Sequence, residues 1–241
     1  MRLLLLRHGR TAWNDSGRFQ GQADPPLDDV GRAQAAAVGP VIRAMRPDLV
    51  VSSDLLRCRA TAAAFGLPYR SDARLREIDL GAWSGLTSAE AGRAFPAEDA
   101  AWRRGEDIRR GGGETYVEVA DRAGALFAEI DAEGLPGGPD SLVVFVLHGG
   151  TARSLIGHLL ELPPGTWWHF GPLRNCRWSV LRREHGRFRL VEHNVGAAGP
   201  DKVGAGPLNA AVATVPSQAA NAGQDVSAAP DTDPVHSGPP A

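Results

Sequence analysis

Runs of consecutive apolar residues alternate along the chain with stretches in which apolar residues recur every three or four positions. Leu3–Leu6 and Leu142–Leu147 are apolar throughout, which is typical of strands buried on both faces of a parallel sheet. Asp48–Val51 predicts a third strand of this kind. Arg177–Arg182 and Phe188–Glu192 predict two further strands.

The helical spacing predicts four long helices between these strands. The first covers about residues 30–44, and we expect Gly39-Pro40 to interrupt and kink it. Ser52-Ser53-Asp54 supplies N-cap candidates for a second helix that ends near Phe65. A capping box that begins at Thr115 opens the third helix. The fourth carries a clean apolar stripe from Ala152 and ends before two consecutive prolines.

This alternation of strands and helices predicts an α/β fold with three layers, α/β/α, around a mostly parallel central sheet. Residues 75–113 depart from the alternation. They contain short polar segments, a brief helix that begins with the capping box at Thr87, and a stop at Gly111-Gly112-Gly113. We therefore expect this excursion to form a small cap inserted over the active site.

Composition divides the 241 residues into two parts. In residues 197–241, 24 of 45 residues are Ala, Pro or Gly, and Phe, Trp and Tyr are absent. Such a segment cannot bury enough apolar surface to offset its ordering entropy, so we predict a disordered tail there and a single domain over residues 1–196. The tail holds four aspartates and one lysine, which leaves the domain with 25 arginines against 24 acidic residues. A domain so close to neutral is not expected to bind nucleic acid through bulk charge.

Cysteine usage and apolar run length point to a cytoplasmic protein. Cys58 and Cys176 stand alone rather than in a CxxC pair, which favours buried thiols in a reducing compartment over a disulfide framework or a zinc site. The longest strongly apolar runs are far shorter than a membrane span, so we expect no membrane partner.

Two predicted strands end in the same way, with Arg7-His8-Gly9 after Leu3–Leu6 and His148-Gly149-Gly150 after Leu142–Leu147. Ligands of open α/β sheets bind at the carboxyl ends of the strands. A histidine such as His8, taken alone, is more often a turn residue bonded to backbone. Arg7 changes this weighing, because a guanidinium at the end of a buried strand is costly unless it meets an anion. Together these residues predict a cationic hole suited to a phosphate.

The sequence around these positions resembles the histidine phosphatase superfamily, the phosphoglycerate-mutase-like proteins. The resemblance begins with the opening motif, runs through five motifs in the order of the family, and covers about residues 1–195. The motifs are Leu6-Arg7-His8-Gly9-Arg10-Thr11-Ala12-Trp13-Asn14 with Phe19–Leu27, Val51–Ala62, Leu75–Leu86, Gly112-Gly113-Glu114-Thr115 and Leu147–Arg153.

The resemblance implies a role for each site residue. His8 would be the nucleophile that becomes a phosphohistidine, and Glu77, rather than its neighbour Asp79, would be the proton donor and later the base. Arg7, Arg57 and His148 would hold the phosphoryl oxygens. Further phosphate or substrate contacts are expected from Asn14, Gln20, Gly21 and Gly149. The family needs no metal and no other cofactor.

Arg10 departs from the family pattern, in which Glu or Gln is usual. It either favours a second anionic group on the substrate or points to solvent. The cap arginines Arg103, Arg104, Arg109 and Arg110 raise the same alternative, since they would suit an acidic substrate or form a solvated basic face.

The segment Leu80-Gly81-Ala82-Trp83 and the short excursion resemble the phosphatase branch rather than the glycolytic mutases. We therefore expect a phosphomonoesterase that acts on a small phosphorylated metabolite, with mutase activity as the alternative within the family. A non-catalytic phosphate-binding protein is the alternative from a different class. The substrates considered are a sugar-acid phosphate such as glucosyl-3-phosphoglycerate and α-ribazole phosphate. Relatives of this type are often dimers, so a homodimer is expected, and Trp167-Trp168 is a candidate for its interface.

Overall fold

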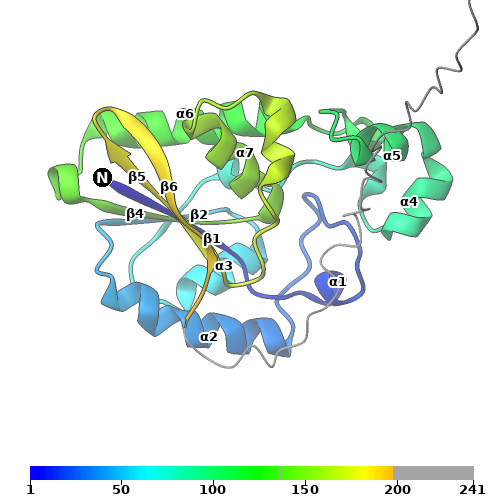
Figure 1. The fold of residues 1–241 in the computed structure, drawn as a ribbon. Coiled ribbons are helices and arrows are strands. Elements are labelled where there is room, and N and C mark those ends of the chain that lie inside the picture. Colours follow the sequence, from blue (N-terminus) through cyan, green and yellow to red (C-terminus); the bar gives the residue numbers. More distant parts are fainter. Residues whose placement is uncertain (136, 198–241) are drawn as a thin grey trace, which may run out of the picture.

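The computed structural model describes residues 1–135 and 137–197. Its centre is a six-stranded sheet with the order β3-β2-β4-β1-β5-β6 (Figure 1). Strands β1 to β4 are parallel and β5 and β6 are antiparallel to their neighbours, which confirms the mostly parallel sheet. The strand β3 was not predicted, because its two residues are exposed and carry no apolar pattern. The strands are β1 (Arg2–Arg7), β2 (Leu49–Ser52), β3 (Arg70–Ser71), β4 (Leu142–Leu147), β5 (Trp178–Glu184) and β6 (Arg187–Val195).

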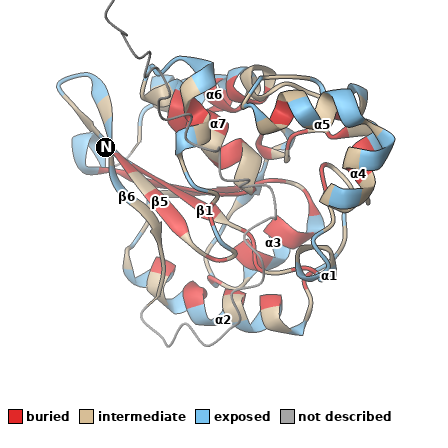
Figure 2. Cartoon of the chain, turned by 45° about the vertical axis from the view of Figure 1, so that its right-hand side comes forward, coloured by how far each residue is buried: buried red, intermediate tan, exposed pale blue. Residues whose placement is uncertain are grey.

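Helices cover both faces of this sheet, as the three-layer prediction requires. Alternate residues of β1 point to opposite faces, so Leu4 and Leu6 pack on one side and Leu3 and Leu5 on the other. The first side is covered by α2 (Asp29–Ala44) and α3 (Leu56–Ala63). The second is covered by α6 (Tyr116–Glu133) and α7 (Gly149–Leu159). Figure 2 shows that the buried residues lie in the strands and on the helix faces turned toward them.

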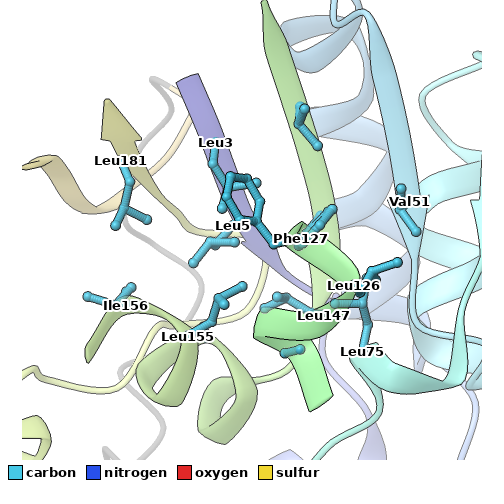
Figure 3. Close-up of a cluster of buried hydrophobic side chains, with 14 of the residues drawn as sticks. Leu3, Leu5, Val51, Leu75, Leu126, Phe127, Leu147, Leu155, Ile156 and Leu181 are labelled. Atoms are coloured by element: carbon cyan, nitrogen blue, oxygen red, sulfur yellow. The ribbon is translucent and has the colours of Figure 1, made fainter. Parts of the chain in front are cut away.

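The core beneath α6 and α7 is a close-packed cluster of aliphatic and aromatic side chains (Figure 3). Leu155 and Ile156 of α7 meet Leu3 and Leu5 of β1, and all four are buried to within about 1% of their surface. Burying a side chain of this size contributes about 1.5–3 kcal/mol to folding. The core therefore holds the start of α7 in a fixed position beside the ends of β1 and β4.

Two features of the helices differ from the sequence prediction. The expected interruption at Gly39-Pro40 is wrong, since α2 runs from Asp29 to Ala44 with Pro40 inside it. Pro40 and Ala36, whose carbonyl loses its N–H partner, are both exposed, so water can solvate that carbonyl. The predicted N-cap of α3 is also wrong. Its capping residue is Leu55, and the distant Asp24 supplies the carboxylate that accepts from the Leu56 N–H at 2.8 Å.

The excursion forms a cap with a small core, in which Trp83 and Trp102 of the cap pack with Val119 of α6. The capping boxes expected at Thr87 and Thr115 are both present. The helices α4 and α5 lie beyond one end of the sheet, to the side of the main layers (Figure 1). The cap contains α4 (Ser88–Ala94), α5 (Pro96–Arg103) and three 3-10 turns, η1 (Ala73–Leu75), η2 (Gly81–Trp83) and η3 (Arg110–Gly112).

Short elements complete the described part of the chain. They are α1 (Ala12–Asp15), η4 (Gly138–Asp140) and η5 (Pro164–His169). None of the helices among the described residues has the length and apolar character that crossing a membrane requires. The tail predicted over residues 197–241 lies outside the described residues, apart from its first position.

A close backbone crossing fixes α2 against the loop that carries His8. A Cβ added to Gly31 would lie 2.0 Å from the carbonyl oxygen of Arg10, which is backbone and cannot move aside cheaply. We expect Gly31→Ala to lower the free energy of unfolding by about 1–3 kcal/mol, measured by chemical denaturation. Gly165→Ala is the matched control, because nothing lies within 4 Å of its added Cβ. Equal stability of the two variants would contradict this account of the crossing.

Candidate active site

The parallel pairing of β1 and β4 brings the two His-Gly motifs together. Arg7 is in register with Leu147, so the residues that follow them, His8 and His148, emerge side by side at the same edge of the sheet. Their ring centroids are 5.1 Å apart, and both side chains are buried. The sequence prediction that two strand ends converge on one site agrees with this arrangement.

Backbone contacts fix the tautomer of His8. Its Nδ1 lies 2.7 Å from the carbonyl oxygen of Gly9, which can only accept, so Nδ1 carries the hydrogen and Nε2 keeps its lone pair. Burial holds the pKa of His8 well below 6.5, and the charges of Arg57 and Arg7 lower that pKa further. The ring is therefore a neutral imidazole with Nε2 available as a nucleophile.

Arg57 is fully buried beside the histidines. Its Nη1 donates to the carbonyl of Ala23 at 2.6 Å and its Nη2 to that of Gly21 at 2.9 Å. Its Nε donates to Nδ1 of His148 at 3.3 Å. The carboxylate of Asp24, which caps α3, lies 3.7 Å from Nη1. These contacts hold the guanidinium in one orientation at the floor of the site.

Arg7 is held by a segment near the end of the described chain. Its Nη1 donates to the carbonyl of Leu173 at 2.6 Å, while its Nε is buried without a hydrogen-bond partner. In the same segment Asn175 donates to the carbonyl of His8 at 3.0 Å and to Oδ1 of Asn14 at 3.2 Å. No local sequence pattern marks this brace, because it lies more than 160 residues from the side chains that it positions.

His148 lies behind Arg57 rather than in the wall of the cavity. Its Nδ1 accepts from Arg57, and its Nε2 lies 3.0 Å from Oγ of Ser53 and 3.3 Å from Sγ of Cys58. Burial lowers its pKa well below the usual value, as does the charge of Arg57. Both ring nitrogens therefore contact protein groups, and the contact of His148 with the phosphoryl oxygens stays a prediction.

Glu77 faces the start of α7. Its Oε2 accepts from the Gly150 N–H at 3.1 Å, and its Oε1 accepts from the N–H and hydroxyl of Thr151 at 3.0 and 3.2 Å. A Cβ added to Gly150 would lie 2.6 Å from Oε1, so only glycine lets the carboxylate come this close. The Asp79 carboxylate instead accepts from the Gly81 N–H at 2.9 Å. Glu77 lines the cavity that holds His8, whereas Asp79 is not among its lining residues in the described chain.

Four of the five predicted substrate contacts line the same cavity, namely Asn14, Gln20, Gly21 and Gly149. Oδ1 of Asn14 accepts three hydrogen bonds, so its NH2 is the end that it can offer to an anion. Arg10 is placed differently. It forms ion pairs with Asp15 and Asp28, the second at 2.8 Å, and it does not belong to the described residues that line the cavity.

The cavity has a volume of about 470 Å³ and extends from His8 to the cap. That volume suits a small metabolite. Several of its wall residues were not predicted from the sequence to belong to the site. Trp168 is one of them, while its neighbour Trp167 is buried and donates to the Leu162 carbonyl at 2.9 Å. These residues are Arg18, Phe19, Trp102, Tyr116, Arg153 and Trp168, and Arg110, one of the cap arginines considered for an acidic substrate, lines the cavity with them.

With this geometry in place, comparison with known proteins identifies the family. The family model described as histidine phosphatase superfamily (branch 1) matches residues 3–196. The chain belongs to the histidine phosphatase superfamily. This membership confirms the enzyme class expected from the sequence, a phosphoric monoester hydrolase.

Relatives of this histidine phosphatase include proteins named for two activities. Glucosyl-3-phosphoglycerate phosphatase of Mycobacterium tuberculosis strain H37Rv is 42% identical over 188 residues, which cover 75% of this chain and 84% of that protein. A probable phosphoglycerate mutase of Salmonella paratyphi C is 35% identical over 190 residues, with the same two coverages. A solved structure of mycobacterial glucosyl-3-phosphoglycerate phosphatase with VO3 matches with a TM-score of 0.76 and 42% identity, covering 81% of this chain and 99% of that one.

The two buried histidines predict an acid limit to the stability of this histidine phosphatase. The unfolded chain takes up protons at the ordinary histidine pKa of 6.5, whereas the folded chain does so only at lower pH. The free energy of unfolding should therefore fall as the pH decreases from 6.5, by up to about 1.4 kcal/mol per pH unit for each histidine. Urea denaturation between pH 7 and pH 5 measures this slope. His8→Asn should reduce it, and a slope that is identical in the variant would contradict the assignment.

Proposed function

We propose that the protein is a metal-independent phosphomonoesterase that works through a phosphohistidine on His8. The observation that carries this proposal is the hydrogen bond from Nδ1 of His8 to Gly9, which leaves Nε2 as an unprotonated nucleophile in a cavity that Arg7 and Arg57 also line. The lone pair of Nε2 attacks phosphorus, and the P–O bond to the alcohol breaks. The two guanidiniums stabilise the charge on the phosphoryl oxygens during the transfer.

Glu77 completes the cycle as acid and then as base. In its protonated form it gives its proton to the leaving alcohol oxygen. The resulting carboxylate then takes a proton from water, whose oxygen attacks the phosphorus of phosphohistidine. The P–N bond breaks, inorganic phosphate leaves, and His8 returns to its neutral form.

For the substrate we propose a small sugar-acid phosphate. The support is the 42% identity to proteins named glucosyl-3-phosphoglycerate phosphatase, together with a cavity lined by five arginines and one carboxylate. The observation behind the mutase alternative is the 35% identical relative named as a probable phosphoglycerate mutase. A mutase would return the phosphoryl group to a second hydroxyl of the substrate rather than to water.

Phosphate release in the presence of a chelator tests these alternatives. The screen contains glucosyl-3-phosphoglycerate, 3-phosphoglycerate, α-ribazole phosphate and sugar phosphates, each with EDTA. We expect stoichiometric release of phosphate and the highest kcat/KM on an acidic ester. Conversion of 3-phosphoglycerate to 2-phosphoglycerate with little release would establish the mutase, and binding without turnover would establish a phosphate-binding protein.

The cellular setting and the partners of the enzyme are proposed on separate grounds. Cys58 and Cys176 are free and buried, which fits a reducing compartment, so we propose the cytoplasm. The near-neutral domain supports a small-molecule substrate rather than nucleic acid as its partner. A homodimer remains our expectation, and light scattering on the full chain tests it.

A further inference from the structure

Arg110 of the cap is a buried cation with no bonded partner for two of its nitrogens. The residue is 3% exposed and lines the cavity, and its Nε and Nη2 are buried without a hydrogen-bond partner. The guanidinium lies 5.3 Å from the ring centroid of Trp102 and 5.0 Å from that of Tyr116. A buried cation is unfavourable unless an anion meets it, and aromatic faces attract it less strongly than a carboxylate does.

Three carboxylates from segments adjoining Arg110 in the sequence are used elsewhere. Glu98 accepts from the Gly111 N–H at 2.7 Å, and Asp107 accepts from the N–H groups at the start of α6. Glu114 pairs with Arg122 at 2.9 Å. The protein therefore directs each of these acids to another group and leaves the guanidinium of Arg110 facing a cavity.

The other cap arginines behave as a solvated surface. Arg103 pairs with Asp99 at 2.7 Å, Arg104 pairs with Glu106 at 2.6 Å, and Arg109 pairs with Glu118. Of the four arginines that the sequence made candidates for an acidic substrate, Arg110 is the one whose side chain is buried in the cavity wall.

A second arginine lines the same cavity and is connected to Arg110 through two packed tryptophans. Arg153, one turn into α7, lies 4.8 Å from the ring centroid of Trp168, and its Nε is buried without a hydrogen-bond partner. Trp168 packs edge-on against Trp102 at 5.6 Å, so a continuous aromatic surface carries both guanidiniums. Arg18, the other arginine at this end of the cavity, already pairs with Glu90 at 3.1 Å.

We propose that Arg110 and Arg153 form a second anion site in the cavity wall, which binds a carboxylate of the phosphomonoester substrate. The inference rests on the proposed function for the phosphate end, where Arg7 and Arg57 meet the phosphoryl group. Guanidinium groups form charge-assisted hydrogen bonds to carboxylate oxygens, and a cavity that excludes water strengthens them. The site makes the enzyme selective for phosphorylated acids over neutral esters of the same size.

A matched pair of substrates tests the selectivity. 3-Phosphoglycerate and glycerol 3-phosphate differ only in a carboxylate that is replaced by a hydroxymethyl group. We expect the wild-type enzyme to favour the acid in kcat/KM, and Arg110→Gln to reduce that preference at least about tenfold. Arg153→Gln should reduce it in the same direction. Arg104→Gln, which changes an exposed arginine outside the cavity, should keep the wild-type ratio.

Several outcomes overturn the proposal while leaving the phosphatase intact. Equal losses on both substrates in Arg110→Gln would assign the residue a structural role in the cap, and thermal unfolding of the variant would show it. A preference that survives both substitutions would also overturn it. A loss confined to fructose 1,6-bisphosphate, relative to fructose 6-phosphate, would mean that the site binds phosphate instead of carboxylate.

Binding separates this inference from the proposed mechanism. In the His8→Asn background, calorimetry measures the Kd of 3-phosphoglycerate without turnover. Arg110→Gln should raise that Kd at least about tenfold and leave the Kd of glycerol 3-phosphate less affected. Absence of hydrolysis by the wild-type enzyme, combined with this selective change in Kd, would refute the proposed function and support the anion site. An unchanged Kd for the acid would refute the site.

Discussion

His8→Asn is expected to lower kcat for phosphate release at least about 10⁴-fold, because the variant loses the atom that forms the covalent intermediate. Asparagine has nearly the size of the imidazole and can still donate to the Gly9 carbonyl, so the loop should keep its place. Incubation with ³²P-labelled substrate and rapid acid-free denaturation measures the intermediate directly. The wild-type enzyme should retain label in a form stable to alkali, and the variant should retain none.

His185→Asn is the matched control for this substitution. His185 is exposed in the turn between β5 and β6 and has a positive φ of 50°, a conformation that asparagine tolerates. Its activity and labelling should equal those of the wild-type enzyme. Full turnover by His8→Asn would refute the phosphohistidine mechanism, whatever the labelling result.

Glu77→Gln is expected to show a loss of activity that depends on the leaving group. With an alkyl phosphate the variant should lose about 10²–10⁴ in kcat, since the leaving alkoxide receives no proton. With p-nitrophenyl phosphate the first step needs no proton donor, whereas the second step still needs the base. Stopped-flow absorbance should therefore record a burst of p-nitrophenol close to one equivalent, followed by slow turnover.

Asp79→Asn provides the comparison for Glu77. The two acids are two residues apart, but Asp79 contacts the Gly81 N–H, and asparagine can keep that bond through its carbonyl oxygen. We expect its activity to stay within a few-fold of the wild-type value on both substrates. A larger loss in Asp79→Asn than in Glu77→Gln would reverse the assignment of the proton donor. Equal losses on alkyl and aryl phosphates in Glu77→Gln would show that the residue positions groups and does not transfer the proton.

Much of the active site could be predicted from local sequence. The apolar runs place His8 and His148 at the ends of two parallel strands, and parallel strands end at the same edge of a sheet. The resemblance to the family added Glu77, Arg57 and the contacts around Gly21. None of these assignments required knowing which distant segments touch, because each motif carries its own strand end, helix start or loop.

The bounds of the helices could be predicted only where the groups that set them are close together in the sequence. The capping boxes at Thr87 and Thr115 were predicted correctly, since both partners of a capping box lie within four residues. The cap of α3 was predicted wrongly, because its acceptor is Asp24, 32 residues away. The continuous course of α2 through Pro40 likewise depends on an exposed neighbouring carbonyl, which the residue pattern does not specify.

The sequence by itself determined the α/β alternation and the two His-Gly strand ends, because period and apolar content are local properties. Only the tertiary structure decided which arginines pair with acids and which line the cavity. Arg10 and Arg104 pair with acids, whereas Arg110 enters the cavity between Trp102 and Tyr116. The physical reason is that a guanidinium's role depends on which anions and rings surround it, and those neighbours are set by packing between distant segments.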